Sequence, residues 1–203
     1  MTSLQPRPML RTLRHQPVQE AVVPYPFVES PNVTRSPGRR VHTVVIHTME
    51  ITERDDAARI SAAWFANPAS EVSAHYCVDR GVVLQCVRDE DVAWHARGGN
   101  ATTIGVELAG AAAQTREQWA DAYSAAVLGR AARLVAELCR RHDIPVRRVD
   151  VQGLRAGARG ITGHVDVSLA FGKSDHWDPG PGFPWGGFLR RVRVAQKGSP
   201  PRP

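Results

Sequence analysis

Three separate segments of the chain carry side chains that bind transition metals. His47 ends the apolar run VVIH, His164 lies in the segment GHVD, and a third segment, SDHWDPGPGFPW, holds Asp175, His176 and Asp178. Two imidazoles and one carboxylate are a donor set of catalytic zinc sites, in which three protein ligands leave the fourth tetrahedral position open for water. The residues therefore indicate a catalytic zinc site, and their chemistry leaves the third ligand open among the three candidates in the last segment.

One carboxylate, Glu107, lies inside the otherwise apolar segment IGVEL. Carboxylates are seldom buried unless they are paired or take part in chemistry. Two interpretations follow from the residues alone. Glu107 either acts in a reaction or forms a structural salt bridge with an arginine.

The elements that position these side chains alternate between strands and helices. We expect strands at 41–47, 103–108 and 161–164, a weak strand at 149–151, a hairpin of 74–78 and 82–87 around the turn DRG, and helices at 54–65, 116–142 and 185–194. In the helix at 54–65, the apolar stripe is predicted to be Ala57, Ile60, Ala63 and Trp64. Strands interspersed with helices predict an α/β fold, a single domain with a central mixed β-sheet flanked by helices.

The ends of the chain differ in composition from its middle. Residues 1–40 contain seven prolines and no sustained periodicity, which predicts an extended N-terminal arm. Residues 196–203 are predicted to be a tail or the start of a linker. The catalytic domain is then expected at 41–195.

Composition excludes several classes of protein. A chain of 203 residues that is 42% hydrophobic is expected to form one domain, and it has no apolar run long enough to cross a membrane. The N-terminus lacks the apolar core of a secretory signal. The charge of +6 favours polyanionic partners, but no DNA-reading motif accompanies it, so we expect no nucleic-acid partner. We also expect the protein to be a monomer. Three scattered cysteines, Cys77, Cys86 and Cys139, are expected to remain reduced.

Five segments occur in one order along the chain: VVIHTME, SAHYCVDRGVVLQCV, VAWHARGGNATTIGVELAG, GITGHVDVS and SDHWDPGPGFPW. Together they resemble the zinc-dependent N-acetylmuramoyl-L-alanine amidases of the amidase-2 type, which are related to peptidoglycan recognition proteins. The resemblance covers residues 41–194, and the sequences of these segments are most similar to those of the amidase domains of phage endolysins. It implies hydrolysis of the amide that joins the lactyl group of N-acetylmuramic acid to L-alanine in peptidoglycan.

The resemblance also assigns roles to particular residues. It implies that Asp178, directly before Pro-Gly-Pro, joins His47 and His164 as a zinc ligand, and that Glu107 is the general base. His176 stands where many relatives carry a lysine that stabilises the oxyanion, so the resemblance implies an oxyanion role for it. A histidine there changes its charge around neutral pH, whereas a lysine does not.

Four further residues match positions that line the substrate groove of the family. The resemblance implies that Tyr76, Trp94, His95 and Asn100 contact the substrate. Two of them have an alternative role: Tyr76 as a core aromatic, and Asn100 in the turn after two glycines. In a regular strand, His75 and Tyr76 point to opposite faces.

The resemblance favours a phage endolysin that is made in the cytoplasm without a signal peptide and is released through a holin. One alternative is a non-catalytic peptidoglycan-binding module, which loses a zinc ligand, whereas His47, His164 and Asp178 are all present here. A second alternative is a cytosolic amidase that recycles soluble muropeptides. The shape of the substrate groove separates an enzyme that takes soluble fragments from one that takes the intact wall.

Overall fold

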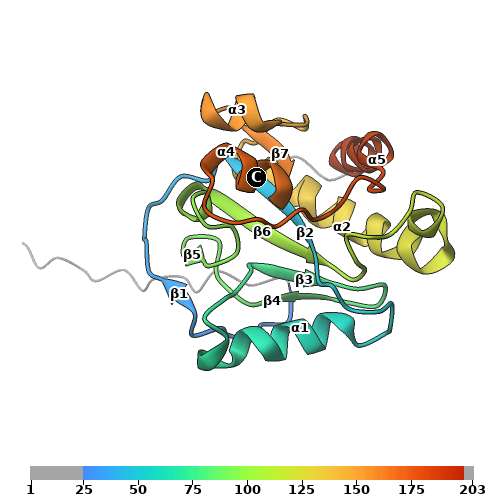
Figure 1. Cartoon of the computed structure of the whole chain (residues 1–203), viewed down its shortest axis with the longest axis horizontal. Helices are drawn as coiled ribbons and strands as arrows, with labels where there is room; N and C mark the ends of the chain where they lie inside the picture. The colour runs from blue at the N-terminus through green and yellow to red at the C-terminus, as the bar shows by residue number, and fades with distance from the viewer. Residues whose placement is uncertain (1–24, 199–203) are drawn as a thin grey trace, which may run out of the picture.

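The computed structural model describes residues 25–198, and a mixed five-stranded sheet lies at its centre (Figure 1). Its strands occur in the order β4-β3-β6-β2-β7, with bounds Val83–Gln85, Tyr76–Val78, Thr103–Leu108, Thr43–Thr48 and Gly160–Gly163. Strand β4 runs antiparallel to β3, and the other neighbouring pairs are parallel. The predicted α/β fold with a central mixed sheet is confirmed.

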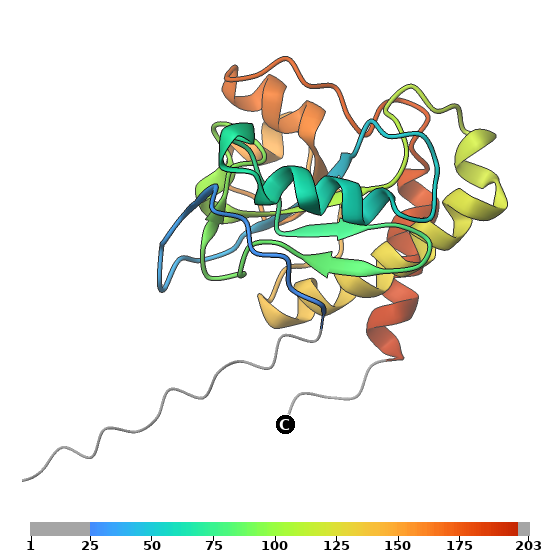
Figure 2. The same cartoon turned by 90° about the horizontal axis from the view of Figure 1, so that it is seen from below.

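Helices cover both faces of this sheet (Figures 1 and 2). On one face α2 (Ala122–Arg141) and α5 (Trp185–Lys197) pack together and enclose the larger core. On the other face lie α1 (Ala57–Ala66), over β3 and β4, and α4 (His164–Phe171), which contacts β2 and β7. The short helix α3 (Val151–Arg155) packs on α4.

Side chains alternate between the two faces of the sheet, so one face is apolar and the other carries the candidate catalytic residues. The side chains in contact with α2 and α5 form one apolar cluster; from the strands it includes Val44, Ile46, Tyr76, Val78, Ile104, Val106, Leu108 and Ile161. The intervening residues His47, Gly105 and Glu107 therefore point to the opposite face, since successive side chains alternate. That face is covered only in part, by α1 and α4.

One predicted element is wrong in part and another is absent, and each error has a capping residue as its cause. The helix predicted from residue 116 begins only at Ala122, because the side chain of Asp121 accepts a hydrogen bond from the Ser124 N–H and ends the preceding short 3-10 helix, Gln118–Ala120. The strand predicted at 149–151 does not form. Asp150 caps α3 through the Gly153 N–H, and only Arg148 makes an isolated bridge to Ile161.

The predicted apolar stripe of α1 is wrong at all positions but Ala57. The buried residues of this helix are Ala57, Ala58, Ser61, Ala62 and Phe65. Of the predicted stripe, only Ala57 is buried, whereas Ile60, Ala63 and Trp64 are exposed, Trp64 by 56%. The stripe was misplaced because two apolar side chains of α1 face a cavity rather than the core.

Part of the predicted N-terminal arm lies on the domain. Strand β1 (Val33–Thr34) pairs with β5 (Val92–Ala93), and the buried side chain of Asn32 donates hydrogen bonds to the carbonyls of Asn67 and Val72, just beyond α1. The arm therefore supports the end of α1 and the segment after it. The rest of the predicted arm, residues 1–24, lies outside the described residues, as do residues 199–203 of the predicted tail.

The cysteines are free and buried, as predicted. The Sγ atoms of Cys77 and Cys86 are 3.9 Å apart, well beyond the length of a disulfide bond. Within residues 25–198, no helix is long and apolar enough to cross a membrane.

Candidate metal and active site

Three elements bring His47, His164 and Asp178 together. His47 lies near the end of β2, and His164 is the first residue of α4, directly after β7, the neighbour of β2. The loop that carries Asp178 is held against α4 by a hydrogen bond from the Val165 N–H to the Asp178 carbonyl. Gly163 permits this approach, because a Cβ at that position would lie 2.8 Å from Pro179 Cδ.

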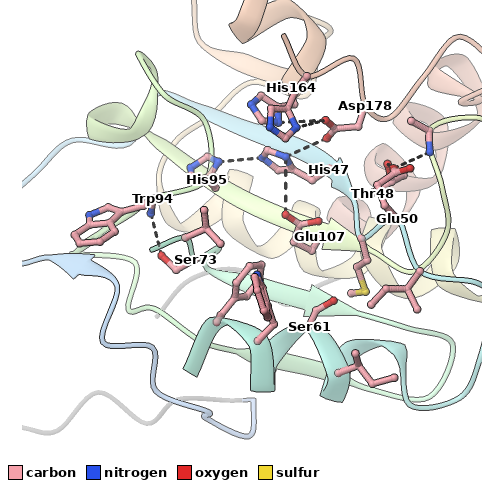
Figure 3. Close-up of a pocket in the computed structure, with 18 of the residues that line it drawn as sticks. His47, Thr48, Glu50, Ser61, Ser73, Trp94, His95, Glu107, His164 and Asp178 are labelled. Carbon is pink, nitrogen blue, oxygen red and sulfur yellow. Dashed lines mark hydrogen bonds and ion pairs between the residues drawn. The ribbon is translucent and has the colours of Figure 1, made fainter. Parts of the chain in front are cut away.

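The three side chains converge on one buried point (Figure 3). His47 Nδ1 lies 3.1 Å from Asp178 Oδ2, and His164 Nδ1 lies 3.2 Å from Asp178 Oδ1. One ligand atom from each residue lies within 4.8 Å of the other two. This is the arrangement of donors that surrounds a small cation.

These residues fit a zinc ion. In the described part of the chain, Asp178 Oδ2 has no hydrogen bond of good geometry although it is buried, and neither has His164 Nε2. A buried acceptor without a partner costs about 1–3 kcal/mol, and a cation between the three side chains would remove that cost at Asp178. Two imidazole nitrogens and one carboxylate oxygen are a donor set that binds zinc at catalytic centres.

The charges around the site favour a carboxylate between two histidines. Burial by itself would raise the pKa of Asp178, but the neighbouring imidazoles of His164 and His47 hold it well below its usual range. Burial lowers the pKa of His164, and the neighbouring His47 lowers it further. Asp178 is therefore ionised and His164 favours its neutral form, which are the protonation states that bind a metal.

Glu107 lies beside this cluster on the adjacent strand. Its Oε1 is 3.9 Å from His47 Nδ1, and no arginine forms an ion pair with it among residues 25–198. Burial raises the pKa of Glu107 well above its ordinary value, and the negative charges of Asp178 and Glu50 add to that effect. A carboxyl group with a raised pKa can both accept and return a proton near neutral pH.

His176 lies at the rim of the cluster rather than within it. Its ring stacks on His164, with centroids 4.4 Å apart and planes at 15°, and 62% of its side chain is exposed. Its Nδ1 lies 3.7 Å from Asp178 Oδ1, beyond hydrogen-bond distance. His176 also lines the cavity above the cluster.

The structure places two predicted substrate-binding residues away from the cavity. Tyr76 is fully buried in the α2 core and donates a hydrogen bond to Asp89, because its register partner is Val106 and not Glu107. The Asn100 side chain accepts hydrogen bonds from the His95 and Ala96 N–H groups, so it serves the turn. For both residues, the alternative role is the one that agrees with the contacts.

Trp94 and His95 both line the cavity. The Trp94 indole donates to Thr34, which fixes the ring at the rim. His95 lies deeper, with Nδ1 at 3.0 Å from His47 Nε2 (Figure 3). Burial lowers the pKa of His95 well below its ordinary value, so the ring is neutral. His95 therefore contacts a candidate metal ligand directly.

A cavity of about 570 Å³ opens over these residues. Its walls are apolar side chains that are partly exposed: Ile60, Trp64, Val72, Trp94 and Trp177. Sequence reasoning missed Trp64 because it lay on a presumed buried stripe, and it missed Trp177 although that residue sits between His176 and Asp178. Exposed tryptophans around a polar floor are typical of a site that binds a large amphipathic ligand.

A further carboxylate of the cavity, Glu50, was not predicted from the sequence. It lines the cavity, and its Oε1 accepts hydrogen bonds from the Thr48 hydroxyl and the Ala112 N–H at 2.5 and 2.8 Å. Its φ of 53° is in the left-handed region, which is uncommon for a residue other than glycine. The side-chain bonds hold the segment after β2 in that conformation. The sequence carries no signal of this backbone geometry.

A family model described as N-acetylmuramoyl-L-alanine amidase matches residues 37–181. The chain belongs to this amidase family. The match includes His47, Glu107, His164 and Asp178, and it ends within the Pro-Gly turn after Asp178. The resemblance inferred from five short segments is thereby confirmed.

The chain is similar in sequence to a known amidase and similar in fold to solved structures. It is 34% identical over 157 residues to N-acetylmuramoyl-L-alanine amidase A of Achromobacter lyticus, covering 73% of this chain and 81% of that protein. Two solved structures share its fold: a mutant endolysin from Bacillus subtilis (TM-score 0.56, 19% identity, 82% and 97% of the two chains) and an AmpD derivative (0.54, 22%, 86% and 96%).

Proposed function

We propose that the protein is a zinc-dependent N-acetylmuramoyl-L-alanine amidase, with residues 41–195 as the catalytic domain and peptidoglycan as the substrate. The observation that supports this proposal most is the buried convergence of His47, His164 and Asp178 beside a carboxylate with a raised pKa. Zinc bound by these three residues would lower the pKa of a water molecule and polarise the scissile carbonyl.

The protein's own side chains carry the proton transfers. Glu107 accepts a proton from the attacking water and returns it to the leaving amine of L-alanine, since its raised pKa suits both directions. His176 donates a hydrogen bond to the carbonyl oxygen as negative charge develops there, from its exposed position above His164. Trp94, Trp64 and Trp177 hold the glycan and the stem peptide along the walls of the cavity.

We further propose that the enzyme acts on the intact cell wall, as phage endolysins do. The cavity is open and has exposed tryptophans on its walls, an arrangement that suits a polymer passing across the site. Comparison of initial rates on purified sacculi and on a soluble muropeptide tests this role. Faster cleavage of the soluble fragment would favour the recycling amidase instead.

Metal content in four variants tests the ligand set. Wild-type protein should bind about one zinc per chain, and His47→Ala or His164→Ala should abolish both zinc binding and turnover. Asp178→Asn should weaken zinc binding, since a neutral amide is a poorer ligand than a carboxylate, whereas His176→Ala should retain the metal. Loss of zinc in His176→Ala together with its retention in Asp178→Asn would make His176 the third ligand.

A further inference from the structure

His95 lies against His47 on the side of the ring away from Asp178 (Figure 3). Its Nδ1 is 3.0 Å from His47 Nε2, while His47 Nδ1 is the nitrogen that faces Asp178. The two rings cross at 86°, with centroids 5.1 Å apart. This contact joins a candidate metal ligand to the loop after β5.

A hydroxyl group on the next strand determines which nitrogen of His95 carries the proton. Thr103 Oγ1 lies 3.0 Å from the Gly99 carbonyl oxygen and 3.0 Å from His95 Nε2. A carbonyl oxygen only accepts, so the single hydroxyl proton of Thr103 is donated to Gly99. The Thr103 oxygen then accepts from His95, and His95 Nε2 must carry the hydrogen.

The same argument extends to His47. A neutral imidazole has one N–H, so His95 Nδ1 is bare and accepts a hydrogen bond from His47 Nε2–H. With its hydrogen on Nε2, His47 presents a bare Nδ1 to Asp178 and to the candidate metal position. In the opposite tautomer, His47 would donate Nδ1–H to Asp178 and could not bind a metal through that atom.

We propose that Thr103 and His95 are positioning residues that fix His47 in the tautomer whose Nδ1 is free to bind zinc. The proposal deepens the proposed function and depends on its zinc site. It also replaces the substrate-binding role expected for His95, and it assigns Asn100 a supporting role in the loop that carries His95. The Asn100 side chain holds the backbone N–H groups of His95 and Ala96, which fixes the loop that carries the ring.

The sheet is shaped to admit the His95 ring. Gly105 lies on β6, where its register partner is Val45 of β2. A Cβ built on Gly105 would lie 2.6 Å from His95 Cγ and 2.7 Å from His95 Nδ1. A side chain at residue 105 would therefore displace His95 from His47. Because Gly105 has no side chain, there is space for the His95 ring between the sheet and the cavity.

Thr103→Val tests the proposal, with Thr43→Val as the matched control. The two threonines are register partners on neighbouring strands and are equally buried, at 3% exposure, but Thr43 is not part of the hydrogen-bond chain from His47. Zinc affinity is measured by competition with a chelator at fixed pH. Thr103→Val should weaken binding by about 10-fold or more, in the range found when partners of metal ligands are removed, and Thr43→Val should leave it unchanged.

Two further readouts do not depend on activity. In metal-free protein, nitrogen NMR of labelled histidines should show His47 protonated at Nε2, and Thr103→Val should shift part of the population to Nδ1–H. His95→Asn keeps an oxygen acceptor near the position of Nδ1, so it should retain more zinc affinity than His95→Leu.

The outcomes separate this inference from the proposed function. Unchanged zinc affinity and an unchanged His47 tautomer in Thr103→Val would overturn the positioning role, as would an equal loss of affinity in Thr43→Val. Wild-type protein that takes up no zinc would overturn the zinc site itself. The NMR measurement on metal-free protein would still test the tautomer in that case, and a wild-type His47 protonated at Nδ1 would contradict it.

Discussion

His47 and Glu107 are register partners on the parallel strands β2 and β6, so a candidate metal ligand and a candidate general base project side by side from one sheet. Their nearest ring nitrogen and carboxylate oxygen are 3.9 Å apart. Both residues belong to six-residue strands whose other residues are all buried, and rigid elements hold catalytic groups more accurately than loops do.

Glu107→Gln should separate proton transfer from metal binding. The amide keeps the size of the side chain but cannot accept a proton, so turnover should fall by roughly 10²-fold or more while zinc is retained. Zinc content by mass spectrometry and the initial rate on sacculi are measured on the same preparation. Near wild-type turnover in a zinc-loaded Glu107→Gln protein would remove Glu107 from the mechanism.

Variants of His176 should test the oxyanion role. His176→Ala removes the donor and should lower turnover by roughly 10²–10³-fold with the metal retained. His176→Lys restores a cationic donor, so much of the activity should return. Initial rates at saturating substrate for the three proteins check this order. Equal rates for wild type and His176→Ala would mean that the residue only stacks on His164.

The tryptophans of the cavity walls should contribute to binding rather than to chemistry. Trp64→Ala and Trp177→Ala each remove an exposed ring, and loss of stacking worth about 0.5–1.5 kcal/mol should raise KM on sacculi by about 3-fold to 10-fold with little change in kcat. Leu169→Ala is the matched control, since that side chain is 61% exposed and is not among the cavity residues. Unchanged KM in both tryptophan variants would exclude these walls from the binding site.

The Asp89 carboxylate should make stability depend on pH. Burial by itself would raise its pKa, but hydrogen bonds with His142 and Tyr76 and the charge of Arg141 hold the pKa of Asp89 well below its usual range. The folded state thus keeps this carboxylate ionised where the unfolded chain takes up a proton, below about pH 4. The stabilisation is complete above that pH and is lost as the pH falls further.

Asp89→Asn should remove that contribution. At pH 6 the free energy of unfolding should fall by about 2 kcal/mol, because the hydrogen bonds from Arg141, His142 and Tyr76 lose their charged acceptor, and the difference from wild type should shrink between pH 4 and pH 3. Urea unfolding of both proteins at each pH checks this, since acid release of any metal affects both. A difference that stays constant from pH 6 to pH 3 would contradict the assignment.

The sequence was sufficient for the parts of the fold with strong periodicity. The strand at 103–108 matches β6 without error, and the helices at 54–65 and 185–194 lie within a few residues of α1 and α5. The residues also indicated His47 and His164 as candidate ligands, and the resemblance to the amidase family singled out Asp178 from Asp175 and His176. Neither step requires knowledge of the tertiary packing.

Other features depend on packing that the sequence does not encode locally. Tyr76 lies in the core because of the register of β3 against β6, and register between distant segments cannot be derived from either one. Trp64 has the spacing of a core residue but faces a cavity. The hydrogen-bond chain from Thr103 through His95 to His47 joins three segments, so it becomes visible only when they are assembled.

The central claim is that this site hydrolyses the lactyl–L-alanine amide with bound zinc. Protein stripped of metal and the same protein reloaded with zinc are incubated with purified peptidoglycan, and the products are identified by mass spectrometry. The reloaded enzyme should release stem peptides with a free L-alanine amino group and leave glycan strands with free lactyl carboxylates, and the stripped protein should release neither. Equal release by the stripped protein, or products cut within the glycan or the cross-links, would contradict this account.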